Sequence, residues 1–322
     1  MASEPMDPTV DQNGSEDFDS IFLEQRQITR FSDTSPVGLA TELFVPSFDQ
    51  IRHKTLELFG KRACAWQVHV CEEILRGDRD VISIAGTGMG KTLTFWMPLL
   101  FRPQGVQVIV TPLNILGEQN TSILTKLNIE AIFISAKTAT EHNFHDIALL
   151  RYRVIIVNPE ELMRPNGGFE TLLKDKLFNS RIISIVIDEA HCISQWGSFR
   201  PEYRDLGRLR HLQRKLCPIL ATSATMSAAV IEDVKKVLRL REEHLFISQC
   251  STDRPNFAIL VRPIVNPIYT YRDLSFVLCD WEPGNLPPPK FIIFFDNIRN
   301  SVDAGNYLRS LLPKDEQYRI KW

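Results

Sequence analysis

The chain has 322 residues, of which 44% are hydrophobic and 24% are charged, and its formal net charge at pH 7 is −2. These values are typical of a soluble protein with room for about two domains, and no apolar run reaches the roughly 18 residues of a membrane-spanning helix. The charge is uneven, because residues 1–50 contain ten acidic and two basic side chains, whereas the rest of the chain has a mildly basic net charge of +6, which is compatible with nucleic-acid binding without requiring it.

The six cysteines are scattered, and none of them forms a Cys-x-x-Cys pair. This spacing argues against a structural zinc site and a disulfide framework, and it favours a reducing compartment. The first residues also lack the charged-then-apolar pattern of a secretion signal. We therefore expect an intracellular protein without a membrane partner.

The N-terminal segment 1–46 is acidic and poor in apolar residues, and we expect it to be largely disordered. Order should begin with a helix for which Ser47 is a plausible N-cap. A second helix is expected over residues 66–75, ending at Gly77.

Apolar runs then alternate with helix-like segments, which predicts a parallel β-sheet covered by helices on both faces. The predicted strands are 81–85, 106–110, 131–135, 154–157, 182–187, 218–221 and 245–248. A well-patterned helix is expected over 227–240. The block from 251 to 322 should contain strands at 257–261 and 291–295, a stiff proline-rich loop at 283–289 and a helix at 300–312.

The first predicted strand leads into Ala-Gly-Thr-Gly-Met-Gly-Lys-Thr at 85–92, and a helix-like run follows. In this setting the loop can turn its backbone N–H groups toward phosphates, and the helix N-terminus adds roughly half a positive charge. Lys91 would reach the β- and γ-phosphates of a nucleotide, and Thr92 would offer its hydroxyl to Mg²⁺. The remaining nucleotide-binding residues would be Thr87, Gly88, Met89 and Gly90.

A second motif follows the predicted strand 182–187, where the chain continues with Asp-Glu-Ala-His at 188–191. Asp188 would hold Mg²⁺, and Glu189 would polarise the water that attacks the γ-phosphate. His191 could link the nucleotide to neighbouring groups, so Lys91, Asp188, Glu189 and His191 are the candidate catalytic residues. Small hydroxyl residues after the next strand, Ser223 and Thr225, could bond to the carboxylates.

In order and spacing these motifs resemble those of superfamily 2 helicases, together with Gln67 and the segments 111–114 and 158–162. The sequence Asp-Glu-Ala-His-Cys-Ile-Ser-Gln-Trp-Gly at 188–197, followed by Phe-Arg-Pro-Glu-Tyr at 199–203, resembles the DEAH motif and aromatic-rich loop of the RecQ family. Asp-Arg-Pro-Asn at 253–256 is similar to that family's entry into the second helicase lobe. The resemblance covers roughly residues 59–312.

The resemblance implies an α/β fold, with a RecA-like P-loop NTPase lobe over 47–250 and the start of an incomplete second RecA-like lobe over 251–322. It implies a 3′→5′ DNA helicase that uses ATP and Mg²⁺, acts on single-stranded or partly duplex DNA in repair or recombination, and resides in the nucleus rather than the cytoplasm. An alternative is a truncated, catalytically weak module that binds ATP and nucleic acid, because the second-lobe motif with the arginine finger would lie beyond residue 322. An unrelated P-loop enzyme, such as a nucleotide kinase, is disfavoured by the motif set.

The resemblance also implies individual roles. Gln67 would read the adenine edge, and the coupling of nucleotide to nucleic acid would involve Gln195, Ser223 and Thr225. Contacts to nucleic acid are expected from Thr111, Asn114, Asn158, Trp196, Phe199 and Arg200, although core packing is an alternative for the two aromatics. The loop departs from the family pattern at Ser198, where RecQ proteins usually have a His-Asp pair.

Overall fold

The computed structural model describes residues 44–213, 217–278 and 290–321. The expected disorder of 1–46 therefore falls almost wholly outside the described residues, as does the predicted loop at 283–289. The described residues form two compact units, the first ending at Asp253 and the second beginning at Arg254.

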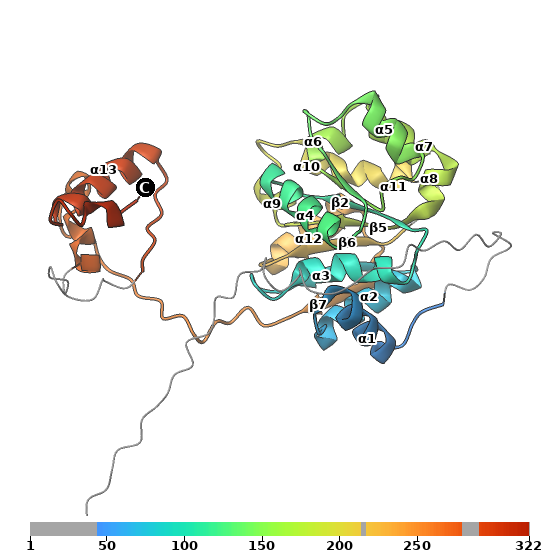
Figure 1. Cartoon of the computed structure of the whole chain (residues 1–322), viewed down its shortest axis with the longest axis horizontal. Coiled ribbons are helices and arrows are strands. Elements are labelled where there is room, and N and C mark those ends of the chain that lie inside the picture. Colours follow the sequence, from blue (N-terminus) through green and yellow to red (C-terminus); the bar gives the residue numbers. More distant parts are fainter. Residues whose placement is uncertain (1–43, 214–216, 279–289, 322) are drawn as a thin grey trace, which may run out of the picture. The chain divides into compact units, whose positions relative to one another are not determined.

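The first unit is built around a seven-stranded β-sheet with the strand order β3-β4-β2-β5-β6-β1-β7 (Figure 1). All pairings between neighbouring strands are parallel. The strands are β1 (Asp80–Ile84), β2 (Val106–Val110), β3 (Ala131–Ile134), β4 (Val154–Val157), β5 (Ile182–Ile187), β6 (Ile219–Ser223) and β7 (Leu245–Gln249). The sequence prediction of all seven is confirmed, and no strand end differs by more than two residues.

The sheet is covered on both faces, which explains why its strands are apolar throughout rather than alternating. Successive residues of β2 illustrate the arrangement: Val108 and Val110 belong to one hydrophobic cluster, and Ile109 belongs to another. The Ile109 side is covered by α1 (Phe48–Phe59), α2 (Ala65–Arg76), α3 (Lys91–Trp96), the 3₁₀ helix η1 (Met97–Leu100) and α4 (Asn114–Lys126).

The opposite face is covered by shorter helices. They are α5 (Glu141–Ala148), α6 (Pro159–Leu162), α7 (Gly168–Lys174), α8 (Lys176–Arg181), α9 (Cys192–Gln195), α10 (Glu202–Asp205), η2 (Leu206–Arg208), α11 (Leu209–Leu212) and α12 (Ala228–Leu238). The turn η3 (Glu242–His244) precedes β7. Among the residues that the structure describes, no helix has both the length and the hydropathy needed to cross a bilayer.

Helix ends follow local signals in the sequence. Ser47 caps α1 as predicted, because its Oγ accepts a hydrogen bond from the N–H of Gln50 and its own N–H donates to the Gln50 side chain. The helices α1 and α2 end at glycines with left-handed backbone angles. Helix α12 stops two residues before the predicted end because Arg239 adopts φ 51°.

The described part of the second unit contains α13 (Ile298–Ser310) and the 3₁₀ helices η4 (Ile268–Thr270), η5 (Arg272–Leu278) and η6 (Gln317–Arg319). The helix predicted at 300–312 is confirmed, two residues earlier than expected. The strands predicted at 257–261 and 291–295 are wrong, since both segments are irregular there and Ile259 is 89% exposed.

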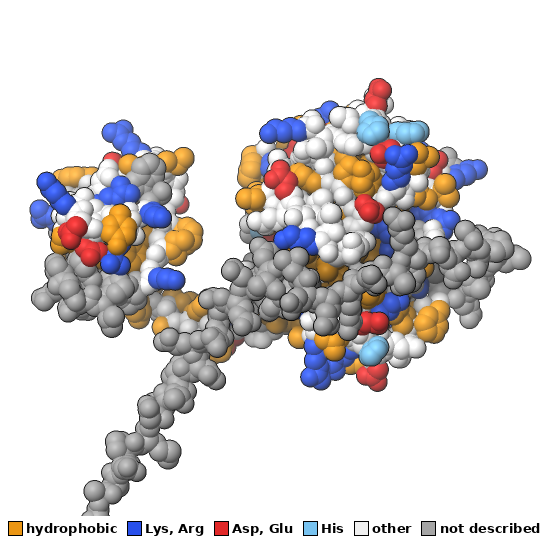
Figure 2. All heavy atoms as spheres, viewed as in Figure 1, with side chains coloured by type: hydrophobic (Ala, Val, Ile, Leu, Met, Phe, Trp, Pro, Cys, Tyr) orange, Lys and Arg blue, Asp and Glu red, His pale blue; other side chains and the backbone are white. Residues whose placement is uncertain are grey.

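A β-strand needs a hydrogen-bonded neighbour, and the described residues of the second unit supply none. Its small core consists of Leu278, Leu308, Leu312 and Ile320, and other hydrophobic side chains reach the surface among basic ones (Figure 2). In its described part the second unit therefore has no sheet of the kind that a RecA-like lobe requires.

Candidate nucleotide and nucleic-acid site

The carboxyl ends of β1, β5 and β6 meet at one edge of the sheet, because these strands are parallel neighbours. The glycine-rich loop continues from β1, the acidic motif follows β5, and Ser223 ends β6. Backbone hydrogen bonds join them, from the N–H of Ala85 to the Ser223 carbonyl (3.2 Å) and from the N–H of Ala190 to the Thr222 carbonyl (2.9 Å). The tertiary structure thus brings three predicted motifs together.

The glycine-rich loop is a tight turn. Gly88 and Gly90 have φ angles of 83° and 81°, which only glycine adopts readily. Lys91 begins α3, and its Nζ donates a hydrogen bond to the Ala85 carbonyl at 2.9 Å, so the ammonium lies back across the loop. Exposed residues form the outer rim, namely Thr87, Gly88, Met89 and Gly90, whereas Thr92 is half-buried in the first turn of α3.

Gln67 lies directly behind this loop and is buried. Its Nε2 donates to the carbonyl of Gly90 at 2.9 Å, and its Oε1 accepts the N–H of Cys64 at 2.7 Å. A Cβ at Gly90 would lie 2.8 Å from this Nε2, which is a second reason for glycine there. Both ends of the Gln67 amide are engaged within the protein, so reading an adenine would require them to change partner.

The two acids of the DEAH motif occupy different environments. Burial, reinforced by the neighbouring Glu189 carboxylate, raises the pKa of Asp188 to about 6. A hydrogen bond with His191 lowers the pKa of Glu189 below its ordinary value. The ammonium of Lys91 lowers the pKa of both carboxyls, so the three charged groups act on one another within a single site.

His191 links the acids to β6. Its Nδ1 lies 2.8 Å from Oγ of Ser223 and 3.2 Å from Oε2 of Glu189, and its Nε2 lies 3.8 Å from Sγ of Cys192. Contacts with Cys192 and Glu189 raise the pKa of His191 to about 10. Glu189 has φ 49°, an uncommon backbone angle for a non-glycine residue, and its carboxylate lies beside the histidine.

Ser223 is the centre of the predicted coupling group. Besides His191, its Oγ contacts Oε2 of Glu189 at 3.4 Å and the carbonyl of Thr225 at 3.0 Å. Thr225 takes part through its backbone, and its side chain is exposed. Gln195 is exposed at the end of α9, and no side-chain contact joins it to this group in the described part of the chain.

The predicted nucleic-acid residues divide into surface and structural positions. Asn114, in the first turn of α4, is exposed, and Phe199 is 65% exposed. Thr111 has no exposed surface, so it cannot contact a nucleic acid directly in this structure. Asn158 caps α6, because its Oδ1 accepts a hydrogen bond from the N–H of Glu161 at 3.0 Å.

Arg200 has a structural role in the protein, and its contact with nucleic acid stays a prediction. Its guanidinium pairs with both carboxylate oxygens of Glu160 and donates to the carbonyl of Pro112 at 2.8 Å. The same group lies over the rings of Trp196 and Tyr203. Trp196 is half-buried, edge-on to Tyr203, with ring centroids 6.2 Å apart.

Sequence reasoning did not assign roles to the partners that hold the site together. Cys192 and Tyr203 were part of the quoted motif, and Glu160 lay in the segment 158–162. Glu160 pairs with Arg200, 40 residues further along the chain, whereas Cys192 and Tyr203 contact the nearby His191 and Arg200. A local signal existed for Glu160, which is an acid two residues after the asparagine that follows β4.

Comparison with known proteins gives a consistent result. The family model described as DEAD/DEAH box helicase matches residues 64–234. The ATP-dependent DNA helicase hus2/rqh1 of Schizosaccharomyces pombe is 32% identical over 208 residues, which cover 61% of this chain and 15% of that protein. The ATP-dependent DNA helicase RecQ of Haemophilus influenzae is 32% identical over 241 residues, covering 74% of this chain and 36% of that protein.

A third relative is named as an RNA helicase instead of a DNA helicase. The putative ATP-dependent RNA helicase R290 of Acanthamoeba polyphaga mimivirus is 34% identical over 202 residues, covering 61% of this chain and 34% of that protein. The chain thus spans between 15% and 36% of the length of these three relatives.

Proposed function

Because the chain belongs to the DEAD/DEAH box helicase family, we propose that it is an ATP-dependent DNA helicase or translocase of the RecQ type. One observation carries the proposal: Lys91 and the acids Asp188 and Glu189 lie at one edge of the sheet, close enough for the ammonium to lower the pKa of both carboxyls. Nucleotide hydrolysis requires a positively charged group that binds the phosphates, placed beside carboxylates that hold the metal ion and activate water.

The residues present suit Mg²⁺ together with ATP. The Thr92 hydroxyl and the Asp188 carboxylate are hard oxygen donors, and two protein ligands leave room for phosphate oxygens and water. When bound, Mg²⁺ neutralises part of the charge on the phosphates. Lys91 would hold the β- and γ-phosphates, and Glu189 would take a proton from the attacking water while His191 fixes its carboxylate.

DNA as the partner is supported by the names of the two RecQ-type relatives and by the exposed aromatic Phe199, on which a base could stack. We extend the proposal to 3′→5′ movement along single-stranded or partly duplex DNA and to a nuclear location. The motif match in 188–203 supports the first, and the expected DNA substrate supports the second.

A second candidate is a module that binds ATP and nucleic acid but turns over slowly. One observation favours it. The described part of the second unit contains no sheet, whereas the proposed helicase cycle requires a second RecA-like lobe.

A steady-state ATPase assay separates the two candidates. The purified chain is assayed with Mg²⁺, alone and with single-stranded DNA or RNA of the same sequence, and Glu189→Gln serves as the inactive control. A helicase should show hydrolysis that DNA stimulates and should displace a strand from duplexes with a 3′ overhang rather than a 5′ overhang. ATP binding without DNA-stimulated turnover would favour the binding module, and stronger stimulation by RNA would refute the choice of DNA.

A further inference from the structure

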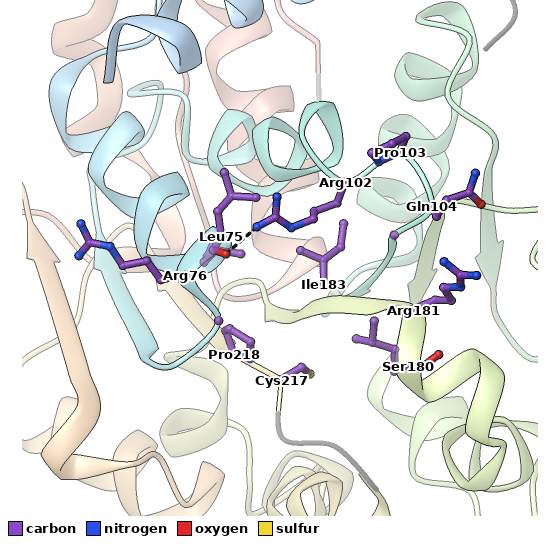
Figure 3. A pocket seen from close by; sticks show the side chains of 14 residues that line it. Leu75, Arg76, Arg102, Pro103, Gln104, Ser180, Arg181, Ile183, Cys217 and Pro218 are labelled. Carbon is purple, nitrogen blue, oxygen red and sulfur yellow. Dashed lines mark hydrogen bonds between the residues drawn. The ribbon is translucent and has the colours of Figure 1, made fainter. Parts of the chain in front are cut away.

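A cavity lies at the edge of the sheet opposite the proposed nucleotide site. It is lined by the end of α2, the turn before β2, the junction of α8 and β5, and the residues before β6 (Figure 3). We call it the N-edge pocket, because all of these segments lie at the N-terminal ends of parallel strands. Its volume is about 320 Å³, which lies within the range of small-molecule sites in proteins.

The walls of the N-edge pocket combine apolar surface with positive charge. Leu75, Ile183 and Pro218 supply apolar surface, and Arg76, Arg102 and Arg181 supply the charge, whereas no acidic side chain lines the pocket among the described residues. In Figure 3 Arg102 reaches across toward the backbone of Leu75, Arg181 stands at the rim near Gln104, and Arg76 points away from the cavity.

Arg102 is held without a negatively charged partner. Its guanidinium donates to the carbonyls of Leu75 at 2.9 Å, and of Phe44 and Phe101 at 3.1 Å each. No carboxylate forms an ion pair with it in the part of the chain that the structure describes. Burial lowers the pKa of Arg102, as expected for a charge that water cannot fully solvate.

Arg153, just behind the turn 102–105, repeats this pattern. It donates to the carbonyls of Leu99 at 3.0 Å, Arg102 at 2.7 Å and Gly105 at 3.2 Å, and burial lowers its pKa as well. Carbonyl oxygens satisfy its hydrogen bonds but supply no full negative charge. Two partly buried cations therefore lie at this edge of the sheet without an ion-pair partner among the described residues, an arrangement that proteins usually avoid.

The ion-paired groups around the pocket do not correct this imbalance. The buried Asp80 pairs with both Arg210 and Arg241, so that two cations share one anion. The Arg210 guanidinium also donates to the carbonyl of Cys217, which lines the pocket. Glu73 likewise pairs with Arg76 and with a second arginine, Arg79. Positive charge thus exceeds negative charge in both of these ion-paired groups.

We propose that the N-edge pocket binds a small organic anion, with one phosphate or carboxylate group and a compact apolar body. The anionic group would pair with Arg181 at the rim and offset the charge of Arg102, since guanidinium groups bind such oxyanions in two-pronged geometry. The apolar body would lie against Leu75, Ile183 and Pro218. A space of this size holds roughly ten waters and thus accommodates a single aromatic ring with its charged group.

This site is independent of the proposed helicase activity and is separated from the glycine-rich loop by the length of the strands. The test uses the full chain carrying Lys91→Ala, so that binding of a phosphate probe to the glycine-rich loop is weakened. Fluorine NMR titrations compare 4-fluorophenyl phosphate, 4-fluorobenzoate and the neutral 4-fluorophenol. We expect saturable binding of at least one anion, and binding of the phenol weaker by about tenfold or more, since the phenol cannot form the charge-assisted, two-pronged pair with Arg181.

The matched variants are Arg181→Gln and Arg76→Gln, which remove the same charge from two lining residues. Arg181→Gln should weaken binding of the anion by about tenfold, whereas Arg76→Gln should change it less than about twofold, because that guanidinium is paired with Glu73 and points away. Thermal unfolding verifies that both variants are folded. Equal affinity for phenol and anions, or equal effects of both variants, would overturn the proposal.

Hydrogen exchange gives a readout that needs no arginine variant. In the Lys91→Ala chain, the bound anion should slow exchange in segments 102–106 and 180–183 and leave the loop 86–92 unchanged. Absence of saturable binding, or protection confined to 86–92, would show that the N-edge pocket is not the site.

Discussion

Arg200 and Glu160 form a two-pronged ion pair, with Nε of Arg200 2.7 Å from Oε1 of Glu160 and Nη2 2.9 Å from Oε2. The third nitrogen, Nη1, donates to the carbonyl of Pro112. One side chain therefore joins three segments that follow β2, β4 and β5. The loop that carries Phe199 is fixed in place by this link, and we expect its removal to weaken both the fold and any response to nucleic acid.

We predict that Arg200→Ala lowers the free energy of unfolding by about 1–2 kcal/mol, because it removes three hydrogen bonds from a partly exposed pair that water screens in part. Arg200→Lys should restore little, since an ammonium cannot reproduce the planar fork. Urea unfolding followed by tryptophan fluorescence measures the change. The control is Arg204→Ala, whose more exposed guanidinium pairs with Asp233, and a loss of equal size there would contradict a special role for Arg200.

Lys91→Ala should weaken ATP binding by about 10- to 100-fold, because it deletes the full charge that would meet the phosphates. The fold should survive, since the side chain makes one hydrogen bond, to the carbonyl of Ala85. Calorimetric titration with ATP and Mg²⁺ gives the affinity. Lys174→Ala removes a surface lysine paired with Glu170 and should leave the affinity unchanged. Equal ATP affinity of the Lys91→Ala chain and its parent would contradict the phosphate-binding assignment.

Affinity for ATP with Mg²⁺ should decline as the pH falls below about 6. The pKa of Asp188 is raised to about 6, so its carboxylate is mostly ionised at pH 7 and mostly protonated at pH 5, and the protonated form cannot hold a cation. We expect a loss of about tenfold in the Mg²⁺-dependent part of the affinity between pH 7 and pH 5. Titrations with Mg²⁺ and with EDTA across this range isolate that part.

Asp188→Asn provides the control for this pH dependence, because the variant should no longer lose ATP affinity as the pH falls from 7 to 5. A carboxyl whose pKa is raised in the folded state costs stability wherever it is ionised, so this cost develops between about pH 4 and pH 6. The variant should therefore unfold at a higher temperature than the parent at pH 7 and at the same temperature at pH 3. If the variant lost ATP affinity between pH 7 and pH 5 as the parent does, protonation of the nucleotide's own phosphates would explain the loss.

Ser223→Ala should reduce turnover more than ATP affinity. It removes the hydroxyl that meets His191 at 2.8 Å and Glu189 at 3.4 Å, so the carboxylate expected to activate water loses part of its positioning. We expect kcat to fall by about tenfold with little change in the Kd for ATP. Steady-state ATPase measurements and ATP titrations report the two quantities separately.

Thr222→Val is the matched control on the same strand. The Thr222 side chain is also buried, but its Oγ1 has no hydrogen-bond partner among the described residues. Its replacement should leave turnover unchanged and should not destabilise the fold. If both variants lost the same turnover, packing at the end of β6 would explain the effect and the hydrogen bonds of Ser223 would not.

Phe199→Ala should affect DNA binding, whereas Trp196→Ala should affect the stability of the fold. Phe199 is 65% exposed, so its removal should leave stability nearly unchanged while weakening single-stranded DNA binding by about 1–3 kcal/mol if a base stacks on it. Trp196 packs edge-on against Tyr203, so its removal should lower the unfolding temperature. Fluorescence anisotropy with labelled DNA and thermal unfolding measure the two effects, and unaltered DNA affinity of Phe199→Ala would exclude it as a stacking platform.

Local patterns account for most of the first unit. A strand buried on both faces is a continuous apolar run, and such runs locate all seven strands without knowledge of their order. The second unit shows the limit of this reasoning, because apolar runs at 257–261 and 291–295 have strand-like composition and no partner strand among the described residues. A strand depends on its neighbours, and composition says nothing about whether these are present.

The sequence by itself determined which residues have the chemistry for nucleotide hydrolysis, because a glycine-rich turn and an acidic strand end are each encoded within a few consecutive residues. Only the tertiary structure decided which of the predicted contact residues are accessible to a ligand. It buried Thr111, engaged Gln67 and Arg200 within the protein, and left Phe199 on the surface. The physical reason is that burial and ion pairing depend on strand order, which brings together residues that are far apart in the sequence. Arg200, for example, contacts Glu160, 40 residues away, and Pro112, 88 residues away.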